Sequence, residues 1–381
     1  MLYSTPDPRA GVWQLEHALH NFSRGNTPCR LVSCPEMFSL VGMGSAAPNS
    51  YETGLHVYVA ACAGNLYWLG NYNDTTHTLE LEESGGAGCG GTPSSGPFSV
   101  DNAGCNILAY GNNHACKSMW DAHTARRIMW CWIRSEGAQT MLNLTWNGMQ
   151  SVPRTITYDR ARRKLRTRPI EELEMLRTNN GHPLAAVESA SLPVSGGTIA
   201  FDDVGQQLDI NVSFKVPVAC IGAHLRQALG VRVMVDNVAK TSAAVTLEFA
   251  QKGEVIPPYN SSAVVWVDLT RSGSNASKGR TQAPLDLFAS TSKSSNDHRV
   301  GRGEQDMVAT FPLRILVDRS VIEVYAQDGI SVISSLMFPP SSRNSGVELY
   351  ATNMGCEVDV AGQLFGMDSA YAPAEANGAV F

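Results

Sequence analysis

The chain has 381 residues, of which 43% are hydrophobic and 17% are charged, and its formal net charge is −6. This composition is typical of a globular protein long enough for two domains, and it excludes a disordered chain. The mild negative charge gives no reason to expect a nucleic acid partner. No apolar run reaches the roughly 18 residues that a membrane-spanning helix needs, so we expect no membrane partner.

The N-terminal segment and the cysteines bear on the cellular compartment. MLYSTPDPRAG lacks the basic and apolar regions of a signal peptide. Six N-x-S/T sequons favour a secretory or vacuolar origin, although such triplets also arise by chance; they begin at Asn21, Asn73, Asn143, Asn211, Asn260 and Asn275. The nine cysteines include no CxxC pair, so we expect no zinc site. Scattered buried thiols and one disulfide are the favoured interpretation.

The N-terminal half contains short apolar segments separated by polar turns. Strands are expected at Leu55–Ala60, Leu66–Tyr72 and Arg127–Ile133. The segment Glu82–Ser99 is rich in glycine, serine and proline, which predicts a long surface loop. Short strands at this spacing, without a long helical period, are typical of an all-β propeller or sandwich.

A basic segment follows these strands. Six basic residues lie within Arg160–Arg168. They could form an anion-binding or nucleic-acid-binding patch, but no aromatic residues interleave, so a solvated connector is the favoured interpretation. Pro169 then opens a short helical stretch that ends at Arg177. These features predict a domain of residues 1–163 and a linker at residues 164–185.

The alternation of apolar and polar residues returns in the C-terminal half. Strands are expected at Leu208–Val216, Val245–Phe249 and Ala263–Leu269 and twice within Val347–Val360, with loops at Thr270–Thr281 and Ser290–Arg302. Over residues 186–381 this pattern predicts a β-sandwich of two sheets.

The clearest alternation lies in Leu313–Gly329, which is LRILVDRSVIEVYAQDG. Apolar residues occupy every second position, and Asp318-Arg319-Ser320 interrupts the run. This pattern predicts a hairpin of two half-buried antiparallel strands closed by a tight turn.

The hairpin resembles a segment in the C-terminal β-sandwich of glycoside hydrolase family 32, the invertases and fructanases. Further stretches resemble motifs of the family in the same order: Tyr110–Asp121 resembles YG-x-x-YASKSF-x-D, Arg126–Trp132 resembles RRILWGW, Gln150–Ile156 resembles Q-(S/A)-I-PRT and Pro169–Arg177 resembles PVEELE-x-LR. The resemblance covers nearly the whole chain and fits the plant-type branch best. It implies a five-bladed β-propeller followed by a β-sandwich, with no cofactor.

The catalytic carboxylates of the family are the part of the resemblance that this sequence matches least well. Members of the family cleave β-fructofuranosidic bonds, as in sucrose, with retention, which needs a carboxylate nucleophile and a carboxylic acid on opposite sides of the bond. The family has its nucleophile in an N-D-P motif and a third carboxylate in an R-D-P motif. Neither motif occurs here, since Asn73-Asp74 is followed by Thr75.

We therefore expect that the chain begins after both aspartates and holds an incomplete propeller of about three blades, out of the five that close such a ring. The missing part would leave a blade edge exposed. Either the gene product is truncated or mispredicted, which is the favoured interpretation, or a partner covers that surface.

The acid/base of the family, the Glu of an E-C-P motif, is replaced. Arg30–Phe38 resembles the family's W-E-C-P-D-x-F with Ser33 at the position of the Glu. A serine hydroxyl is too weak an acid to protonate a glycosidic oxygen. Glu36 is the candidate substitute, although on a regular strand an offset of three residues places it on the opposite face unless a bulge at Pro35 intervenes. Its alternative role is local hydrogen bonding.

Four residues are candidates for substrate binding. Trp68 and Trp130 could stack on a sugar ring, although aromatic residues on propeller strands more often pack within the blades. Asn112 follows Ala109-Tyr110-Gly111, where many plant invertases have D-Y-G-K, and the loss of both charges puts sucrose specificity in doubt. Lys117 is the charged residue that is kept within the family's K-S motif.

Other notable polar residues are expected to be structural. His17 and His20 have an i, i+3 spacing without further ligands nearby, so we expect no metal site. Glu323 is expected to support the fold of the sandwich.

Four functional interpretations stay open. The first is a catalytically defective β-fructofuranosidase, and the second is a working hydrolase that uses carboxylates not homologous to those of the family. The third is a non-catalytic fructan- or glycan-binding protein, and the fourth is an interaction module in which the sandwich alone is functional. The partner expected from the family is a small carbohydrate, sucrose or a fructan. The family and the sequons imply a secretory, extracellular or vacuolar location, and the oligomeric state is not predicted.

Overall fold

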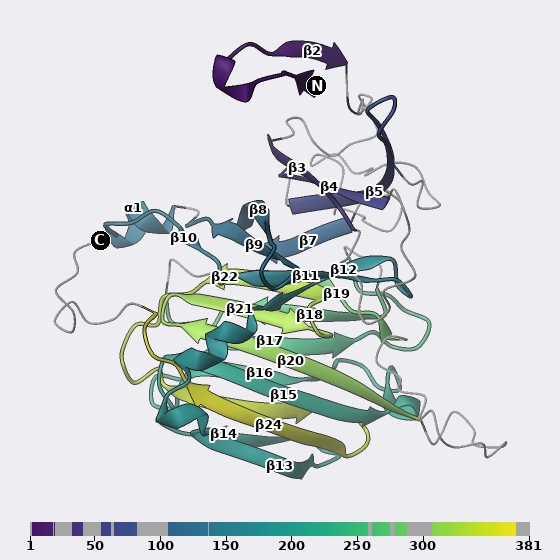
Figure 1. Ribbon diagram of the computed structural model, residues 1–381. Helices are drawn as coiled ribbons and strands as arrows, with labels where there is room; N and C mark the ends of the chain where they lie inside the picture. The colour runs from purple at the N-terminus through teal and green to yellow at the C-terminus, as the bar shows by residue number, and fades with distance from the viewer. Residues whose placement is uncertain are drawn as a thin grey trace.

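The computed structural model describes residues 2–17, 19, 33–40, 55–61, 65–81, 106–135, 137–257, 261–274, 279–287 and 307–370. Most of these residues lie in β-strands, with the N-terminal sheets above a larger C-terminal sandwich (Figure 1). The expectation of an all-β fold is therefore confirmed. The loops predicted at Glu82–Ser99 and Ser290–Arg302 lie outside the described residues. In the part of the chain that is described, no helix has the length and apolar character needed to cross a membrane.

The C-terminal half is built from two antiparallel sheets. The first contains the strands β13 (Ala185–Leu192), β24 (Val358–Gly366), β15 (Gln207–Pro217), β20 (Val308–Asp318), β21 (Val321–Ala326) and β22 (Ser331–Leu336), in this spatial order. The second contains β14 (Gly197–Phe201), β23 (Gly346–Thr352), β16 (Gln227–Asp236), β17 (Thr241–Phe249), β18 (Ala263–Asp268) and β19 (Arg280–Pro284).

The core of the sandwich lies between these two sheets. Alternate residues of each strand point inward, as the period-two pattern predicts. Phe214, Phe249 and Phe311 are almost completely buried, and the rings of Phe249 and Phe311 meet edge to face at 5.2 Å. Burying one such side chain contributes about 2–3 kcal/mol, so this core supplies much of the free energy that holds the sandwich together.

The N-terminal half forms two further antiparallel sheets and one hairpin. The first sheet contains β3 (Ser33–Ser39), β4 (Leu55–Ala61), β5 (Asn65–Asn73), β6 (Thr78–Leu81) and β7 (Asn106–Gly111). The second contains β8 (Asn113–Asp121), β9 (Arg126–Ile133), β10 (Met149–Gln150), β11 (Arg154–Asp159) and β12 (Lys164–Pro169), while β1 (Leu2–Ser4) pairs with β2 (Gln14–His17). Short antiparallel sheets of this kind are the units from which propeller blades are built.

A parallel pairing joins the two halves of the chain. Strand β7 lies beside β22 of the sandwich, with Tyr110 opposite Ile333 and Gly111 opposite Ser334. The first sandwich sheet and the first N-terminal sheet are therefore one continuous sheet of eleven strands. Gly111 has a φ of +78°, and a Cβ at this position would lie 2.3 Å from the carbonyl oxygen of Ser334. Only glycine allows this close approach of the two backbones.

The hairpin predicted at Leu313–Gly329 is present as β20 and β21. One detail differs, because β21 is buried along its whole length rather than on one face. Its outer face is covered by segments outside the sandwich: Tyr325, Leu316 and Val332 pack against Val152 of the N-terminal half and Leu173 of η2 (Glu171–Leu176). The strand is thus buried by a contact between segments distant in the sequence, which its own pattern does not encode.

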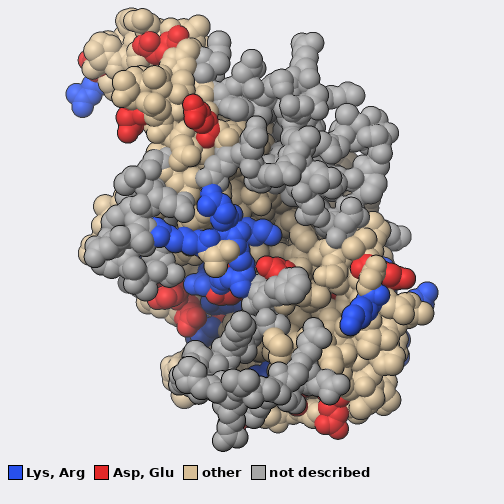
Figure 2. Space-filling view, turned by 90° about the vertical axis from the view of Figure 1, so that its right-hand side faces the viewer, with Lys and Arg blue, Asp and Glu red and all other residues tan. Residues whose placement is uncertain are grey.

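The basic segment 160–168 lies in the hairpin β11–β12 rather than in a free connector. Asp159 accepts hydrogen bonds from Arg162 and Arg166, and Arg166 and Arg168 both pair with Asp328 of the sandwich. Basic side chains gather on the face seen in Figure 2, with acidic side chains beside them. The stretch 170–184, between β12 and β13, carries two short 3₁₀ helices, Glu171–Leu176 (η2) and Asn179–Gly181 (η3).

Candidate functional site

Ser33 opens β3, and a bulge follows it directly. Ser33 pairs with Ala61 of β4 and Glu36 pairs with Val59, so three steps along β3 match two steps along β4. Cys34, inside the bulge, has a positive φ of 51°. The extra residue reverses the alternation of faces, so Ser33 and Glu36 point to the same side of the sheet. The parity argument against Glu36, made for a regular strand, therefore does not apply.

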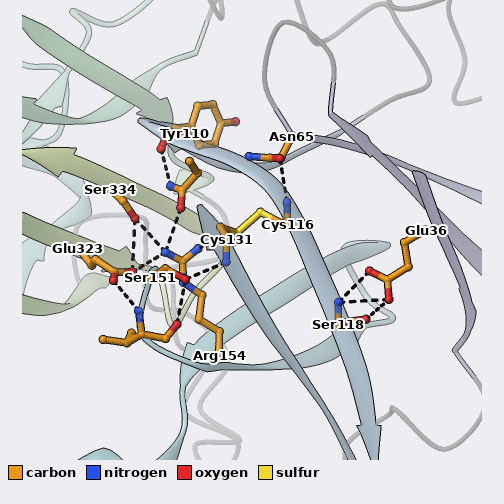
Figure 3. Close-up of a disulfide and its surroundings, with 12 residues drawn as sticks. Glu36, Asn65, Tyr110, Cys116, Ser118, Cys131, Ser151, Arg154, Glu323 and Ser334 are labelled. Carbon is orange, nitrogen blue, oxygen red and sulfur yellow. Dashed lines mark hydrogen bonds and ion pairs between the residues drawn. A yellow bond between two sulfur atoms is a disulfide. The ribbon is translucent and has the colours of Figure 1, made fainter. Parts of the chain in front are cut away.

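The carboxylate of Glu36 is held by the neighbouring sheet (Figure 3). Ser118 of β8 donates its backbone N–H over 2.9 Å and its hydroxyl over 2.6 Å to Glu36, and Arg127 of β9 lies 3.7 Å away. Burial lowers the pKa of Arg127, against the attraction of Glu36, but it stays a cation because an Arg pKa is high. Glu36 thus connects β3 to β8, which fits its alternative role in local hydrogen bonding.

Lys117 and Trp130 lie beside this contact. They are opposite each other in the pairing of β8 with β9. The ammonium group of Lys117 donates a hydrogen bond to the carbonyl of Pro35 over 2.5 Å, and Trp130 is half-buried. The structure therefore brings the predicted residues Ser33, Glu36, Lys117 and Trp130 into one region, where β3 meets β8 and β9.

Trp68 and Asn112 lie elsewhere. Trp68 on β5 is only 4% exposed, and its ring lies 5.8 Å from that of Tyr58, which favours packing within the blade over a sugar subsite. Asn112 follows β7 and binds the sandwich: its backbone N–H donates to the carbonyl of Ser334 over 2.8 Å, and its side-chain oxygen accepts from the backbone of Leu336 over 3.3 Å.

The region around Ser33 offers little acid chemistry. The hydroxyl of Ser33 donates a hydrogen bond to the carbonyl of Ala61 over 3.3 Å. A hydroxyl in this position cannot serve as the proton donor for a leaving sugar oxygen near neutral pH. His17, expected to be structural, contacts the carbonyl of His77 over 2.9 Å, and His20 lies outside the described residues. Nowhere in the described ranges do three or more His, Cys, Asp or Glu residues gather to hold a metal ion.

A buried polar joint between the two halves is the largest feature that the sequence did not reveal. The guanidinium of Arg154 on β11 is fully buried and pairs with the carboxylate of Glu323 on β21 (Figure 3). Arg154 also donates to the hydroxyls of Tyr325 over 2.9 Å and Ser334 over 2.8 Å. The second oxygen of Glu323 accepts from the backbone N–H of Val152 over 2.8 Å.

The protonation of this joint follows from its burial. Burial raises the pKa of Tyr325 well above its usual range, so its phenol stays neutral and donates to Glu323 over 2.9 Å. Glu323 supports the fold as expected, but by binding the N-terminal half. Arg154 was visible in the sequence only as a member of the segment Gln150–Ile156, with no signal of its partner.

The cysteines form more disulfides than expected. Cys116 on β8 is bonded to Cys131 on β9, and Cys220 is bonded to Cys356 in the sandwich. The expectation of scattered buried thiols and one disulfide was wrong, because the fold brings together cysteines whose sequence spacing carries no signal: β8 and β9 pair Cys116 with Cys131, and Cys220 and Cys356 meet outside the strands. Cys34 in the bulge of β3 is a free thiol.

A groove of about 1040 Å³ lies between the N-terminal half and the outer face of the first sandwich sheet. Neutral hydroxyl and amide side chains line it, from Thr155, Thr157, Asn211, Ser213 and Gln363. Among its charged residues, Arg314 binds Glu174 and the nearby Asp209, and Asp328 binds Arg168, while the carboxylates of Glu171 and Glu188 also line the groove. The groove thus presents neutral hydrogen-bonding groups together with an excess of acidic side chains.

The described strands form blade-type antiparallel sheets joined to a two-sheet β-sandwich. Family models identify the class of protein to which this architecture belongs. Residues 1–169 match the family model for the glycosyl hydrolases family 32 N-terminal domain, and residues 172–362 match the model for the family 32 C-terminal domain. The chain belongs to glycoside hydrolase family 32.

Individual relatives come from plants. The chain is 29% identical over 283 residues to an acid β-fructofuranosidase of Solanum lycopersicum, covering 69% of this chain and 41% of the relative. It is 25% identical over 278 residues to a vacuolar acid β-fructofuranosidase 4 of Arabidopsis thaliana, covering 69% of this chain and 40% of the relative. The chain thus spans about two fifths of the length of these relatives.

A solved structure shows the same fold. The crystal structure of fructan 1-exohydrolase IIa from Cichorium intybus superimposes with a TM-score of 0.64 at 21% identity, covering 89% of this chain and 62% of that chain. The expected architecture, a propeller followed by a sandwich in the plant-type branch of the family, is therefore confirmed.

Proposed function

We propose that this polypeptide is a β-fructofuranosidase-type member of family 32 that does not itself hydrolyse sucrose or fructans. The observation that carries the proposal is Ser33 at the acid/base position. Glu36, the carboxylate on the same face, is occupied by hydrogen bonds from Ser118.

The chemistry of retaining hydrolysis supports this proposal. The reaction needs two carboxyl groups about 5 Å apart, one to attack the anomeric carbon and one to protonate the leaving oxygen. The printed sequence has neither an N-D-P nor an R-D-P motif. Together with Ser33 in place of the acid/base, this means that three carboxylates of the family are not found in this polypeptide: the nucleophile, the Asp of R-D-P and the acid/base. It keeps the scaffold but lacks the groups that form and resolve a glycosyl intermediate.

The experiment is an assay of fructose release by the purified chain and two variants. With sucrose or an inulin oligosaccharide, we expect the unaltered chain to match a protein-free blank. We expect Ser33→Glu to stay at the blank as well, because one acid without a nucleophile does not complete the reaction. Fructose release that disappears in Glu36→Gln would show that Glu36 replaces the missing acid, and would overturn the proposal.

A second candidate function is non-catalytic binding of a fructan or another glycan. The groove of hydroxyl and amide side chains favours it, since such groups match the hydroxyls of a neutral sugar. Calorimetry with an inulin oligosaccharide tests this function: binding without turnover, weakened by Gln363→Ala and unchanged by Gln139→Ala, is the expected result. Gln139 lies on the short helix α1 (Ala138–Leu142) and does not line the groove. No heat of binding at millimolar ligand would count against it.

We also propose a division into a propeller domain, residues 1–163, a linker, 164–185, of which 164–169 form β12 and pair with the propeller domain, and a sandwich, 186–381. The location that we propose is secretory, extracellular or vacuolar. The two disulfides support this location, since such bonds persist in oxidising compartments. Limited proteolysis tests the division: cleavage first within 170–184 supports it, whereas first cleavage inside a sandwich strand contradicts it.

A further inference from the structure

Two cysteines of this chain stand where the family motifs carry other residues. Cys116 takes the place of the first Ser in YASKS, and Cys131 takes the place of the Gly in RRILWGW. Strands β8 and β9 bring these positions together, and the two residues form a disulfide across a sequence separation of 15. Because either substitution alone would make no bond, the two form one coupled feature of this chain.

The disulfide lies at an irregular point of β8. The pairing of β8 with β9 shifts register between His114 and Lys117, and Ala115 has a positive φ of 50°. Such a bulge interrupts the backbone hydrogen bonds between two strands, and the left-handed conformation is unfavourable for a residue with a side chain. The bond therefore holds β8 to β9 where the backbone alone holds them least.

Two of the contacts of this sheet with its neighbours lie beside the disulfide (Figure 3). Ser118, two residues after Cys116, makes the hydrogen bonds to Glu36 of β3. On the other side, the sulfur of Cys131 lies 3.8 Å from the guanidinium of Arg154, which pairs with Glu323 of the sandwich. The disulfide thus lies between the joint to the first N-terminal sheet and the joint to the sandwich.

We propose that Cys116–Cys131 is an oxidation-dependent clamp that positions Ser118 for Glu36 and Arg154 for Glu323. It forms by thiol–disulfide exchange with a small disulfide such as oxidised glutathione. The two cysteine thiols give up two electrons and two protons to form the S–S bond, and the oxidant leaves as two thiols. The contacts of Ser118 with Glu36 and of Arg154 with Glu323 are therefore held by the clamp only where such an oxidant is present.

Burial protects the clamp once it has formed. Cys116 is 2% exposed and Cys131 is 1% exposed, whereas Cys220 and Cys356 of the second disulfide are half-buried. An attacking thiolate must reach a sulfur atom before exchange occurs. A reductant added to the native protein therefore opens Cys220–Cys356 first, and opens the clamp only after β8 separates locally from β9.

The test combines hydrogen exchange with a variant that restores the motif residues, C116S/C131G. The matched control is C220S/C356S, which removes the other disulfide. In C116S/C131G we expect the backbone amides of Ser118 and Val152, the donors to Glu36 and Glu323, to exchange about 100-fold faster, as loss of a cross-link of this loop length implies. In the control, exchange at both amides is expected to stay unchanged.

Equal exchange at both amides in C116S/C131G and in the unaltered chain would overturn the proposal. If C116S/C131G fails to fold, the unaltered chain decides the question. It is treated with increasing dithiothreitol, alkylated, and analysed by mass spectrometry together with hydrogen exchange. Molecules alkylated at Cys116 are expected to have lost protection at Ser118. Full protection in these molecules, or alkylation of Cys116 before Cys220, contradicts the clamp.

Discussion

At the scale of single residues, the pair of Arg154 and Glu323 is costly to disturb. Both side chains are almost completely removed from water. Two buried charges are tolerated only when they pair and their remaining hydrogen-bonding groups are satisfied. Tyr325, Ser334 and the backbone of Val152 supply those further bonds.

Glu323→Gln is expected to lower the free energy of unfolding by about 3–5 kcal/mol, because it leaves the guanidinium of Arg154 buried without a counter-charge. Urea denaturation followed by tryptophan fluorescence measures the loss. The matched control is Glu348→Gln, which breaks the more exposed pair of Arg232 and Glu348 and is expected to cost at most about 1 kcal/mol. Equal losses in the two variants would contradict the importance of the buried joint.

Asp159 gives the hairpin β11–β12 a defined dependence on pH. Burial opposes ionisation of this carboxyl, but hydrogen bonds from Arg166 and Arg162 outweigh it and lower the pKa from 3.8 to about 2. A depressed pKa contributes stability above the unfolded value and loses it as the pH falls through the folded value. The stabilising effect of Asp159 is therefore complete above about pH 4 and is lost towards pH 2.

Asp159→Asn tests this dependence. The variant is expected to be less stable than the unaltered chain near neutral pH, and the difference is expected to shrink as the pH falls from about 4 to about 2. Urea denaturation at a series of pH values measures the difference. A difference that grows on acidification would show that Asp159 is not held as a carboxylate by the two arginines.

At the scale of elements, the parallel contact of β7 with β22 depends on one glycine. Gly111→Ala adds a methyl group that would meet the carbonyl of Ser334, at a backbone conformation with φ of +78°. Gly11→Ala is the matched control, since Gly11 has a similar φ of +68° but open space around it. We expect a cost of about 1–2 kcal/mol for the control, from the left-handed conformation alone, and a larger cost for Gly111→Ala. Equal unfolding midpoints in the two variants would contradict this contact.

The sequence predicted the elements better than the contacts between them. The period-two pattern identified the hairpin β20–β21, since alternation reports which residues of a strand face a core. It did not show that β21 is buried on both faces, because the cover comes from Val152 and Leu173. Nor did it pair Arg154 with Glu323, since the two residues are 169 positions apart.

In the candidate site too, the sequence predicted the identity of the residues but not the contacts that place them. The motif around Ser33 predicts the loss of the acid, because residue identity alone carries that signal. The bulge at Cys34 determines where Glu36 points, and it depends on a backbone conformation that the pattern leaves open. The placement of Trp68 and Asn112 away from this region likewise follows from tertiary contacts, with Tyr58 and with the strand β22.

At the scale of the whole molecule, the two halves are joined by backbone pairing, by the buried ion pair and by the contacts of Asp328 with Arg166 and Arg168. This joint uses residues of the family's motifs, in Tyr110–Asp121, Gln150–Ile156 and Leu313–Gly329. The scaffold of family 32 is thus retained in these segments. We propose that the polypeptide keeps this scaffold without the acid, with Ser33 at the acid/base position.

The most direct test of that claim is the rate of fructose release from sucrose, measured with the purified chain at high concentration between about pH 4 and pH 7, where retaining glycosidases use one protonated and one ionised carboxyl group. The chain is expected to release no more fructose than the same chain after heat denaturation. Release that is proportional to the concentration of folded chain and saturates with sucrose would contradict the account.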